Sequence, residues 1–143
     1  MAEQMSAAEL MGYLEEVFPQ VRGDFAVETL SAAQIQMRLK VQEKHLRPGG
    51  TVSGPSMFGL ADCAAYAMIL SRIGRQALAV TTSSSMDFMR KPAAGQDLIA
   101  ECRLLKLGRA LAVCDILIFS EGQDGVVARA AMTYSIPPAR PQE

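Results

Sequence analysis

Strict alternation of apolar and polar residues marks one strand near the middle of the chain. Between residues 34 and 42 every second side chain is apolar, and the side chains between them are polar or charged. The apolar positions are Ile35, Met37, Leu39 and Val41. A period of two places them on one face, so this segment is predicted to be a half-buried strand with one wet face.

Helical spacing precedes this strand. Residues 5–19 carry apolar side chains three and four positions apart, Glu15 and Glu16 lie between them, and Pro19 closes the segment. The pattern predicts a short amphipathic helix.

A second helix is predicted from Pro55 to about Arg72, with Gly74 at its end. Proline suits the first turn of a helix because its missing N–H would have no partner there, and Ser53 or Gly54 precedes it as a cap. The segment is apolar nearly all round, so other elements must enclose it. Its glycine and alanine residues allow those elements to approach closely.

Four strand-like segments follow, separated by short loops rich in glycine and proline. They span residues 77–89, 97–107, 110–120 and 125–136. The short connections predict an antiparallel meander. The order of elements then predicts an α+β domain in which a single sheet covers the long helix.

The 143 residues are expected to form one domain. Its core spans about residues 33–136, after a helical extension over residues 1–30. Prolines in residues 137–143 cannot continue a ladder of hydrogen bonds, so this tail is expected to be disordered.

Composition narrows the classes of protein. Half of the residues are hydrophobic and the net charge is −1, so there is no global field for nucleic acid. The three cysteines contain no CxxC pair, which argues against a disulfide framework and a zinc site. The N-terminus lacks the basic start and apolar core of a secretory signal, and the one long apolar run is shorter than a membrane span. The sequence therefore predicts a cytoplasmic protein with no membrane segment. No metal is expected, because metal ligands do not cluster in the sequence.

Asp62 is the only charged residue between Pro55 and Leu70. Removing an ionised carboxylate from water costs several kcal/mol unless partners compensate, and no Lys, Arg or His lies three or four residues away. Such a carboxylate is a candidate for chemistry. The alternative is that Asp62 caps a backbone group or faces solvent.

Two motifs resemble those of the PaaI-like acyl-CoA thioesterases, which belong to the hot-dog fold and the 4-hydroxybenzoyl-CoA thioesterase superfamily. Residues 50–64 read GTVSGPSMFGLADCA and resemble the family stretch G-T-V-H-G-G followed by L-A-D. Residues 86–95 read MDFMRKPAAG and resemble its D-F-L-R-P-A motif, which a glycine follows. A Leu-Gly-Arg turn at residues 107–109 matches a family hairpin, and the resemblance covers about residues 33–136.

The resemblance implies a hot-dog fold, an antiparallel sheet wrapped around a long central helix, here with an extra N-terminal helix. It implies hydrolysis of an acyl-CoA thioester to free acid and coenzyme A, with Asp62 as nucleophile or general base. Coenzyme A is then part of the substrate, and no separate cofactor is expected. Family members are homodimers or homotetramers, in which the loop before one helix faces the carboxylate of the partner's helix.

Thioester hydrolysis also needs donors for a carbonyl oxygen that becomes anionic, and the start of a helix offers backbone N–H groups. Gly54 would let a ligand approach the backbone, or it only makes the turn into the helix. Ser53 stands where the family has histidine, and its hydroxyl serves either the substrate or the helix cap. Pro55 replaces a second glycine and has no N–H, which leaves Gly54, Ser56 or Met57 as donors.

Arg47 stands where the family has an asparagine, and it either binds a phosphate or carboxylate or is solvated. Tyr66 lies one helical turn after Asp62, so its hydroxyl either contacts the same substrate or reaches a backbone carbonyl from the core. Ser83 and Ser85 share one face of their strand with Asp87. This face or the opposite one is expected to line the acyl pocket.

Basic residues at strand ends are candidates for the phosphates of coenzyme A, although solvated surface charge is the ordinary role of each alone. They are Arg90, Lys91, Lys106 and Arg109.

Other chemistries have less support. His45 is the only histidine, and no nucleophile-elbow motif is present. Cys63 points to a different side of the helix from Asp62 and is expected to be a buried structural thiol. Two other functions stay open: a non-catalytic hot-dog protein that binds acyl-CoA or another acyl ligand, and a dimerisation module.

Overall fold

The structure is a computed structural model that describes residues 4–138. Within this range the chain forms two α-helices and six β-strands, with short 3-10 turns at Pro19–Val21 and Glu43–His45. In chain order the elements are α1 (Ala7–Val17), β1 (Phe25–Leu30), β2 (Gln34–Leu39), α2 (Gly54–Ile73), β3 (Val80–Phe88), β4 (Leu98–Leu107), β5 (Leu111–Ser120) and β6 (Val126–Ser135).

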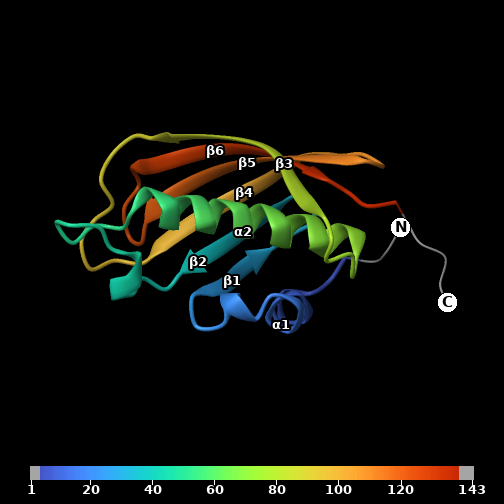
Figure 1. The fold of residues 1–143 in the computed structure, drawn as a ribbon, viewed down its shortest axis with the longest axis horizontal. Helices are drawn as coiled ribbons and strands as arrows, with labels where there is room; N and C mark the ends of the chain where they lie inside the picture. Colours follow the sequence, from blue (N-terminus) through green and yellow to red (C-terminus); the bar gives the residue numbers. More distant parts are fainter. Residues whose placement is uncertain (1–3, 139–143) are drawn as a thin grey trace.

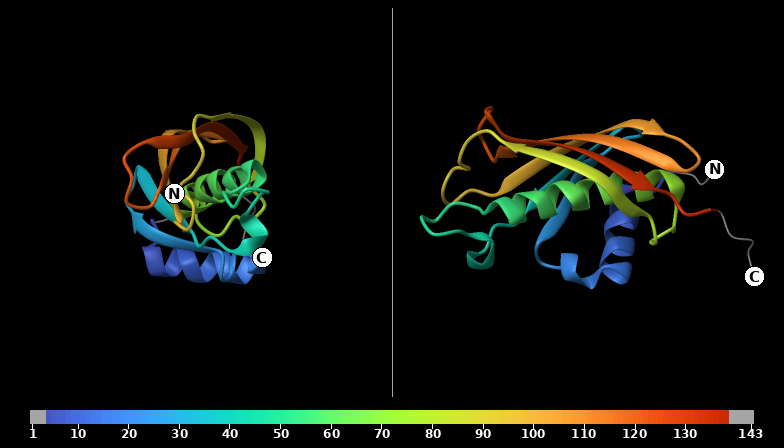
Figure 2. Two further views of the ribbon diagram at one scale, coloured as in Figure 1. Left: turned by 90° about the vertical axis from the view of Figure 1, so that its left-hand side faces the viewer. Right: turned by 45° about the horizontal axis from the view of Figure 1, so that its top comes forward.

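The six strands form one antiparallel sheet that curves around α2 (Figures 1 and 2). Its strand order is β1-β2-β4-β5-β6-β3. Helix α1 lies beside β1 at one margin of the sheet (Figure 1). The α+β hot-dog architecture with an additional N-terminal helix is therefore confirmed.

Helix α2 begins and ends where the sequence predicts. The side chain of Ser53 accepts a hydrogen bond from the N–H of Ser56, and Pro55 occupies the first turn. Gly74 ends the helix with a φ of 88°, a conformation that favours glycine.

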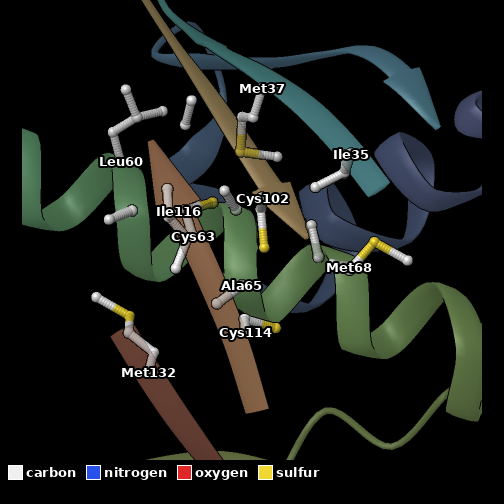
Figure 3. Packing of buried hydrophobic residues seen from close by; sticks show 14 of the residues in the cluster. Ile35, Met37, Leu60, Cys63, Ala65, Met68, Cys102, Cys114, Ile116 and Met132 are labelled. Atoms are coloured by element: carbon white, nitrogen blue, oxygen red, sulfur yellow. The ribbon is translucent and has the colours of Figure 1, made fainter. Parts of the chain in front are cut away.

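The core lies between α2 and the inner face of the sheet (Figure 3). On β5 the inward side chains alternate regularly with exposed or half-buried ones, and Ile116 and Ile118 are fully buried. Alanines 64, 65 and 67 of α2 are also fully buried, so the sheet approaches the helix backbone closely. The absence of a polar face on this helix thus reflects its enclosure.

Residues 25–30 correct the prediction of a helical extension over residues 1–30. They form β1, which pairs antiparallel with β2 and matches Phe25 to Leu39 and Leu30 to Ile35. An irregularity between Val27 and Thr29 breaks the register. This bulge interrupts the period of two that identifies longer strands in a sequence.

The prediction of a four-strand meander is also wrong for β3. Only β4, β5 and β6 follow one another as neighbours, whereas β3 pairs with β6 and lies at the sheet edge. Residues 89–97 connect β3 to β4, and β4 pairs with β2 on its other side. The strand was predicted correctly, but its partner depends on contacts that local patterns do not report.

Arg38 of β2 forms ion pairs with three carboxylates, which link β1 and two connecting segments to β2. Its guanidinium pairs with Glu28 of β1 at 2.7 Å, with Asp97 before β4 at 2.9 Å, and with Glu121 after β5. The Arg38 side chain is 21% exposed, so these ion pairs are shielded from solvent more than ordinary surface pairs are.

Among residues 4–138, α2 alone has the length and apolar composition of a membrane span. Most of it is buried beneath the sheet, as befits a core helix. The tail predicted to be disordered lies outside the described residues from position 139 onward, as do residues 1–3 of the predicted extension.

Candidate active site

Asp62 is held by two hydroxyl groups of its own chain. Its Oδ1 accepts hydrogen bonds from Thr81 Oγ1 and from the Tyr134 hydroxyl, both at 2.6 Å. Within residues 4–138 no hydrogen bond is made to its other carboxylate oxygen, Oδ2. One oxygen is therefore anchored, and the other remains available to a ligand.

The sheet places both donors. Thr81 of β3 and Tyr134 of β6 are paired residues, so their side chains lie on the same face of the sheet, towards α2. Burial, followed by the hydrogen bond to Asp62, raises the pKa of Tyr134. The phenol therefore stays protonated and keeps donating to the carboxylate.

A cavity of about 410 Å³ opens beside Asp62, which is half-buried in its wall. Aromatic residues surround part of it. The rings of Phe18 and Tyr66 meet edge to face with centroids 6.4 Å apart, and the ring centroids of Tyr66 and Tyr134 are 6.2 Å apart. Phe25 of β1 also lines the cavity. We call this space the Asp62 cavity.

The hydroxyl of Tyr66 is already occupied. It donates to the carbonyl oxygen of Ala77 at 2.6 Å, which confirms the alternative of a backbone contact. Burial raises the pKa of this phenol, so it remains a donor. Tyr66 thus contributes its ring to the cavity wall, while a contact between its hydroxyl and substrate stays a prediction.

At the start of α2, the helix cap uses the hydroxyl of Ser53. Its Oγ accepts from the N–H of Ser56 at 3.3 Å and donates to Ser56 Oγ at 3.0 Å. The N–H of Met57 donates to the Ser53 carbonyl. Of the three N–H groups predicted to be donors, only that of Gly54 forms no hydrogen bond within the described residues.

Gly54 lines a second cavity, also about 410 Å³ in volume, which we call the Gly54 cavity. A Cβ atom on Gly54 would lie 3.3 Å from Cζ of Phe88, so the glycine permits a close approach of this ring. Arg47, Arg90 and Lys91 line the same cavity. Three of the predicted phosphate-binding residues are therefore gathered around the start of α2.

The two cavities are separate in one chain. Gly54 and Asp62 are eight residues apart on α2, which corresponds to about 12 Å along the helix axis. Each cavity borders one end of β3: Val80 and Thr81 line the Asp62 cavity, and Phe88 lines the Gly54 cavity. A thioester carbonyl cannot contact Asp62 and the N–H of Gly54 from the same chain.

Ser83 and Ser85 lie on the other side of the sheet. They are paired with Thr133 and Ala131 on the face away from α2, and they line neither cavity. The opposite face of β3 points towards the helix, because Met86 packs against the core. A substrate-binding role for the two serines stays a prediction without support from this placement.

Arg109 and Lys106 do not join the other basic residues. Arg109 follows the end of β4, whereas Arg90 and Lys91 precede its start. The ten residues of β4 span about 30 Å, so a single chain does not bring the four cations predicted for phosphates together.

His45 lines neither cavity. Its Nδ1 accepts a hydrogen bond from the backbone N–H of Gln42, and Nε2 lies 3.6 Å from a carboxylate oxygen of Asp24. In the described part of the chain, no group of three His, Cys, Asp or Glu residues is arranged to hold a metal ion.

Sequence reasoning missed Thr81, Tyr134, Phe18 and Phe25. Tyr134 had a detectable signal, because it continues an inward-facing alternation of small and apolar residues on β6. A hydroxyl in such a position needs a buried partner. The role of Phe25 was hidden by the missed strand β1.

Comparisons with known proteins identify the family to which the chain belongs. Residues 49–134 match the family model described as thioesterase superfamily, and the chain belongs to this family. A protein of Pseudomonas aeruginosa named provisionally as an esterase is 31% identical over 116 residues, which cover 80% of this chain and 84% of that protein.

Solved structures extend the similarity over nearly the whole chain. A Silicibacter protein described provisionally as a thioesterase is 62% identical with a TM-score of 0.90, and 96% of each chain is covered. A mutant of the phenylacetic acid degradation protein PaaI from Thermus thermophilus is 27% identical with a TM-score of 0.72, over 83% of this chain and 99% of that one. The PaaI-like resemblance is thus confirmed.

A Streptococcus mutans protein bound to acetyl-CoA shares the fold. It is 23% identical with a TM-score of 0.72, and the match covers 85% of this chain and 94% of that one.

Cys63 is expected to be chemically inert in the native protein. Burial, and secondarily the charge of Asp62, raises the pKa of its thiol to about 12, and Cys102 and Cys114 are fully buried in the core (Figure 3). At pH 8 the thiolate form of Cys63 is therefore much less populated than that of a free cysteine. Native protein should therefore react with a disulfide reagent such as DTNB only slowly, whereas all three thiols react after unfolding in guanidinium.

The control for this measurement is Cys63→Ser. Rapid labelling of one thiol in the native protein that disappears in this variant would show that Cys63 is reactive.

Proposed function

We propose that this protein is an acyl-CoA thioesterase, with Asp62 as the nucleophile or general base. The observation that carries the proposal is the asymmetric anchoring of this carboxylate. Thr81 and Tyr134 hold Oδ1, while Oδ2 has no hydrogen bond within residues 4–138 and Asp62 borders a cavity. A fixed carboxylate with one available oxygen suits either role.

As a general base, Asp62 takes a proton from water while the water oxygen bonds to the thioester carbonyl carbon. The carbon–sulfur bond then breaks, and the proton goes to the sulfur of coenzyme A, leaving the free acid. As a nucleophile, Oδ2 attacks the same carbon, coenzyme A leaves, and water hydrolyses the resulting anhydride. Both routes place negative charge on the carbonyl oxygen, and the N–H of a Gly54 at the start of a second copy's helix would stabilise this charge.

We infer that each site combines Asp62 of one copy with Gly54 of a second copy. Strand β3 lies at the sheet edge, and edge strands are ready templates for pairing. If two β3 strands pair antiparallel about a two-fold axis, the Val80 end of one meets the Phe88 end of the other. The Asp62 cavity of each copy then lies beside the Gly54 cavity of its partner.

Exposed apolar side chains at both ends of β3 support this arrangement. Leu78 and Val80 are 67% and 56% exposed, and Phe88 and Met89 are 55% and 50% exposed. Apolar residues gathered along an unpaired edge favour association with a partner. We propose a homodimer as the minimal functional unit.

The Gly54 cavity is proposed to hold the phosphates of coenzyme A. Arg47, Arg90 and Lys91 all line it and are exposed, so their charges are available to a polyanionic ligand. The acetyl-CoA bound by the Streptococcus mutans protein supports a ligand of this class for the fold. Coenzyme A enters as part of the substrate, without a further cofactor.

One observation favours a second function, that of a non-catalytic acyl-CoA-binding protein. The cap uses the hydroxyl of Ser53 and Pro55 has no N–H, so this region offers only the Gly54 N–H to an oxyanion. A site with a single donor stabilises the transition state less than one with two. Binding of acyl-CoA without release of free thiol would select this alternative.

Asp62→Asn is expected to lower kcat for acyl-CoA hydrolysis by about a hundredfold or more, the usual range for losing a general base or nucleophile. The asparagine oxygen still accepts from Thr81 and Tyr134, so the fold should be retained. Release of free coenzyme A and the unfolding midpoint are measured for both proteins.

The matched control is Asp87→Asn, which removes an exposed carboxylate paired with Arg129 on the outer face. Equal turnover by wild type and Asp62→Asn would contradict the assignment of Asp62.

Mixed oligomers test whether two copies share a site. Gly54→Asp keeps a residue that suits the start of a helix but places a negative charge where the oxyanion forms, so it should be inactive. Refolding it in a 1:1 mixture with Asp62→Asn should restore about a quarter of the wild-type sites, because half of the dimers contain both variants and each has one intact site.

Activity of the mixture is compared with the sum of the two variants measured separately. A mixture no more active than this sum, with mixed dimers shown by two affinity tags, would contradict a site shared by two copies.

Arg47→Gln is expected to raise KM for acyl-CoA about fivefold with little change in kcat, as for the loss of roughly 1 kcal/mol from an exposed ion pair. A thioester of pantetheine, which lacks the nucleotide phosphates, should show no such change. Arg103→Gln, on the outer face of β4, serves as the control. A similar rise in KM with both substrates would exclude a contact between Arg47 and the phosphates.

A further inference from the structure

The wall of the Asp62 cavity contains residues that precede the segment matched by the family model. That match begins at residue 49, yet Phe18 and Phe25 border the same cavity as Asp62. Asp62 comes from the matched segment, whereas residues outside that segment help to shape the space beside its carboxylate.

The backbone around Phe18 is well fixed. Its N–H donates to the carbonyl of Leu14 at the end of α1, Pro19 begins the 3-10 turn, and Val21 is 1% exposed in the core. The ring of Phe18 is not part of that core, because the residue is 40% exposed. It meets Tyr66 edge to face across the cavity wall.

We infer that Phe18 is a specificity-determining residue whose ring closes the outer side of the Asp62 cavity and limits the length of the acyl group. This inference rests on the proposed thioesterase function. A volume of about 410 Å³ lies near the lower end of the usual range for ligand cavities. We therefore expect thioesters of compact acyl groups to be better substrates than those of long fatty chains.

Gly59 is a position at which a larger side chain would make the Asp62 cavity smaller. It lies three residues before Asp62 on α2 and lines the same cavity. A Cβ atom built on Gly59 would meet no atom within 4 Å. The first atom of a larger side chain at this position would therefore enter cavity space without displacing other residues.

The test compares kcat/KM along a series of straight-chain acyl-CoA thioesters, from acetyl to palmitoyl, with benzoyl-CoA added. Phe18→Ala should move the optimum to longer chains and raise the ratio of long-chain to short-chain kcat/KM about tenfold, since a methylene in an apolar pocket is worth about tenfold or more. Gly59→Leu should move the optimum to shorter chains. Val17→Ala, which removes a neighbouring apolar side chain outside both cavities, should keep the wild-type profile.

An unchanged length profile in folded Phe18→Ala would overturn the inference, as would an equal shift in Val17→Ala. If Phe18→Ala does not fold by circular dichroism, Phe18→Leu carries the same test with more apolar area retained. If the wild type hydrolyses none of the thioesters, the proposed function fails, and calorimetric binding of the same series decides the role of Phe18 alone. A length preference in binding that Phe18→Ala shifts supports the inference, and an unshifted one overturns it.

Discussion

The enclosure of α2 by the sheet is the constraint on which the rest of the structure depends. A helix with apolar residues on nearly every side must be covered over most of its surface, and the curved six-stranded sheet provides that cover. The same enclosure determines how a carboxylate can exist on this helix. Asp62 is tolerated because the two strands that close over it, β3 and β6, each supply a hydroxyl. The fold and the candidate site are thus consequences of one packing arrangement.

The length of α2 then separates the functional groups. Its start offers an unbonded N–H and three nearby cations, while its middle offers the carboxylate about 12 Å away. In the proposed mechanism, hydrolysis of a thioester needs both halves. The edge strand β3 connects the two halves, because its ends border the two cavities and its outer edge is unpaired within the described chain. Pairing of this edge with a second copy is the simplest way to complete a site.

Much of this fold was predictable because its signals are local. The apolar run and the Pro55 and Gly74 boundaries define α2, and regular alternation defines β2. The bulged strand β1 and the partner of β3 were not predictable in the same way, because a bulge breaks the period and pairing is a long-range property. Asp62 was evident as an isolated charge. The hydroxyls that hold it were not, because they come from strands whose pairing the sequence left undetermined.

Ser53 and Pro55 replace a histidine and a glycine of the family motif. In the proposed site these replacements affect the donors for the oxyanion rather than the carboxylate. Ser53 stabilises the start of α2 as its cap, and Pro55 fixes the first turn without requiring an acceptor. Together they leave the N–H of Gly54 as the unbonded group at this end of the helix, in line with the helix dipole. Gly54 also has no side chain to hold Phe88 away, so the ring of Phe88 lies close to the start of the helix. In the proposed mechanism, the helix dipole strengthens this single donor, which offsets part of the loss of a second donor.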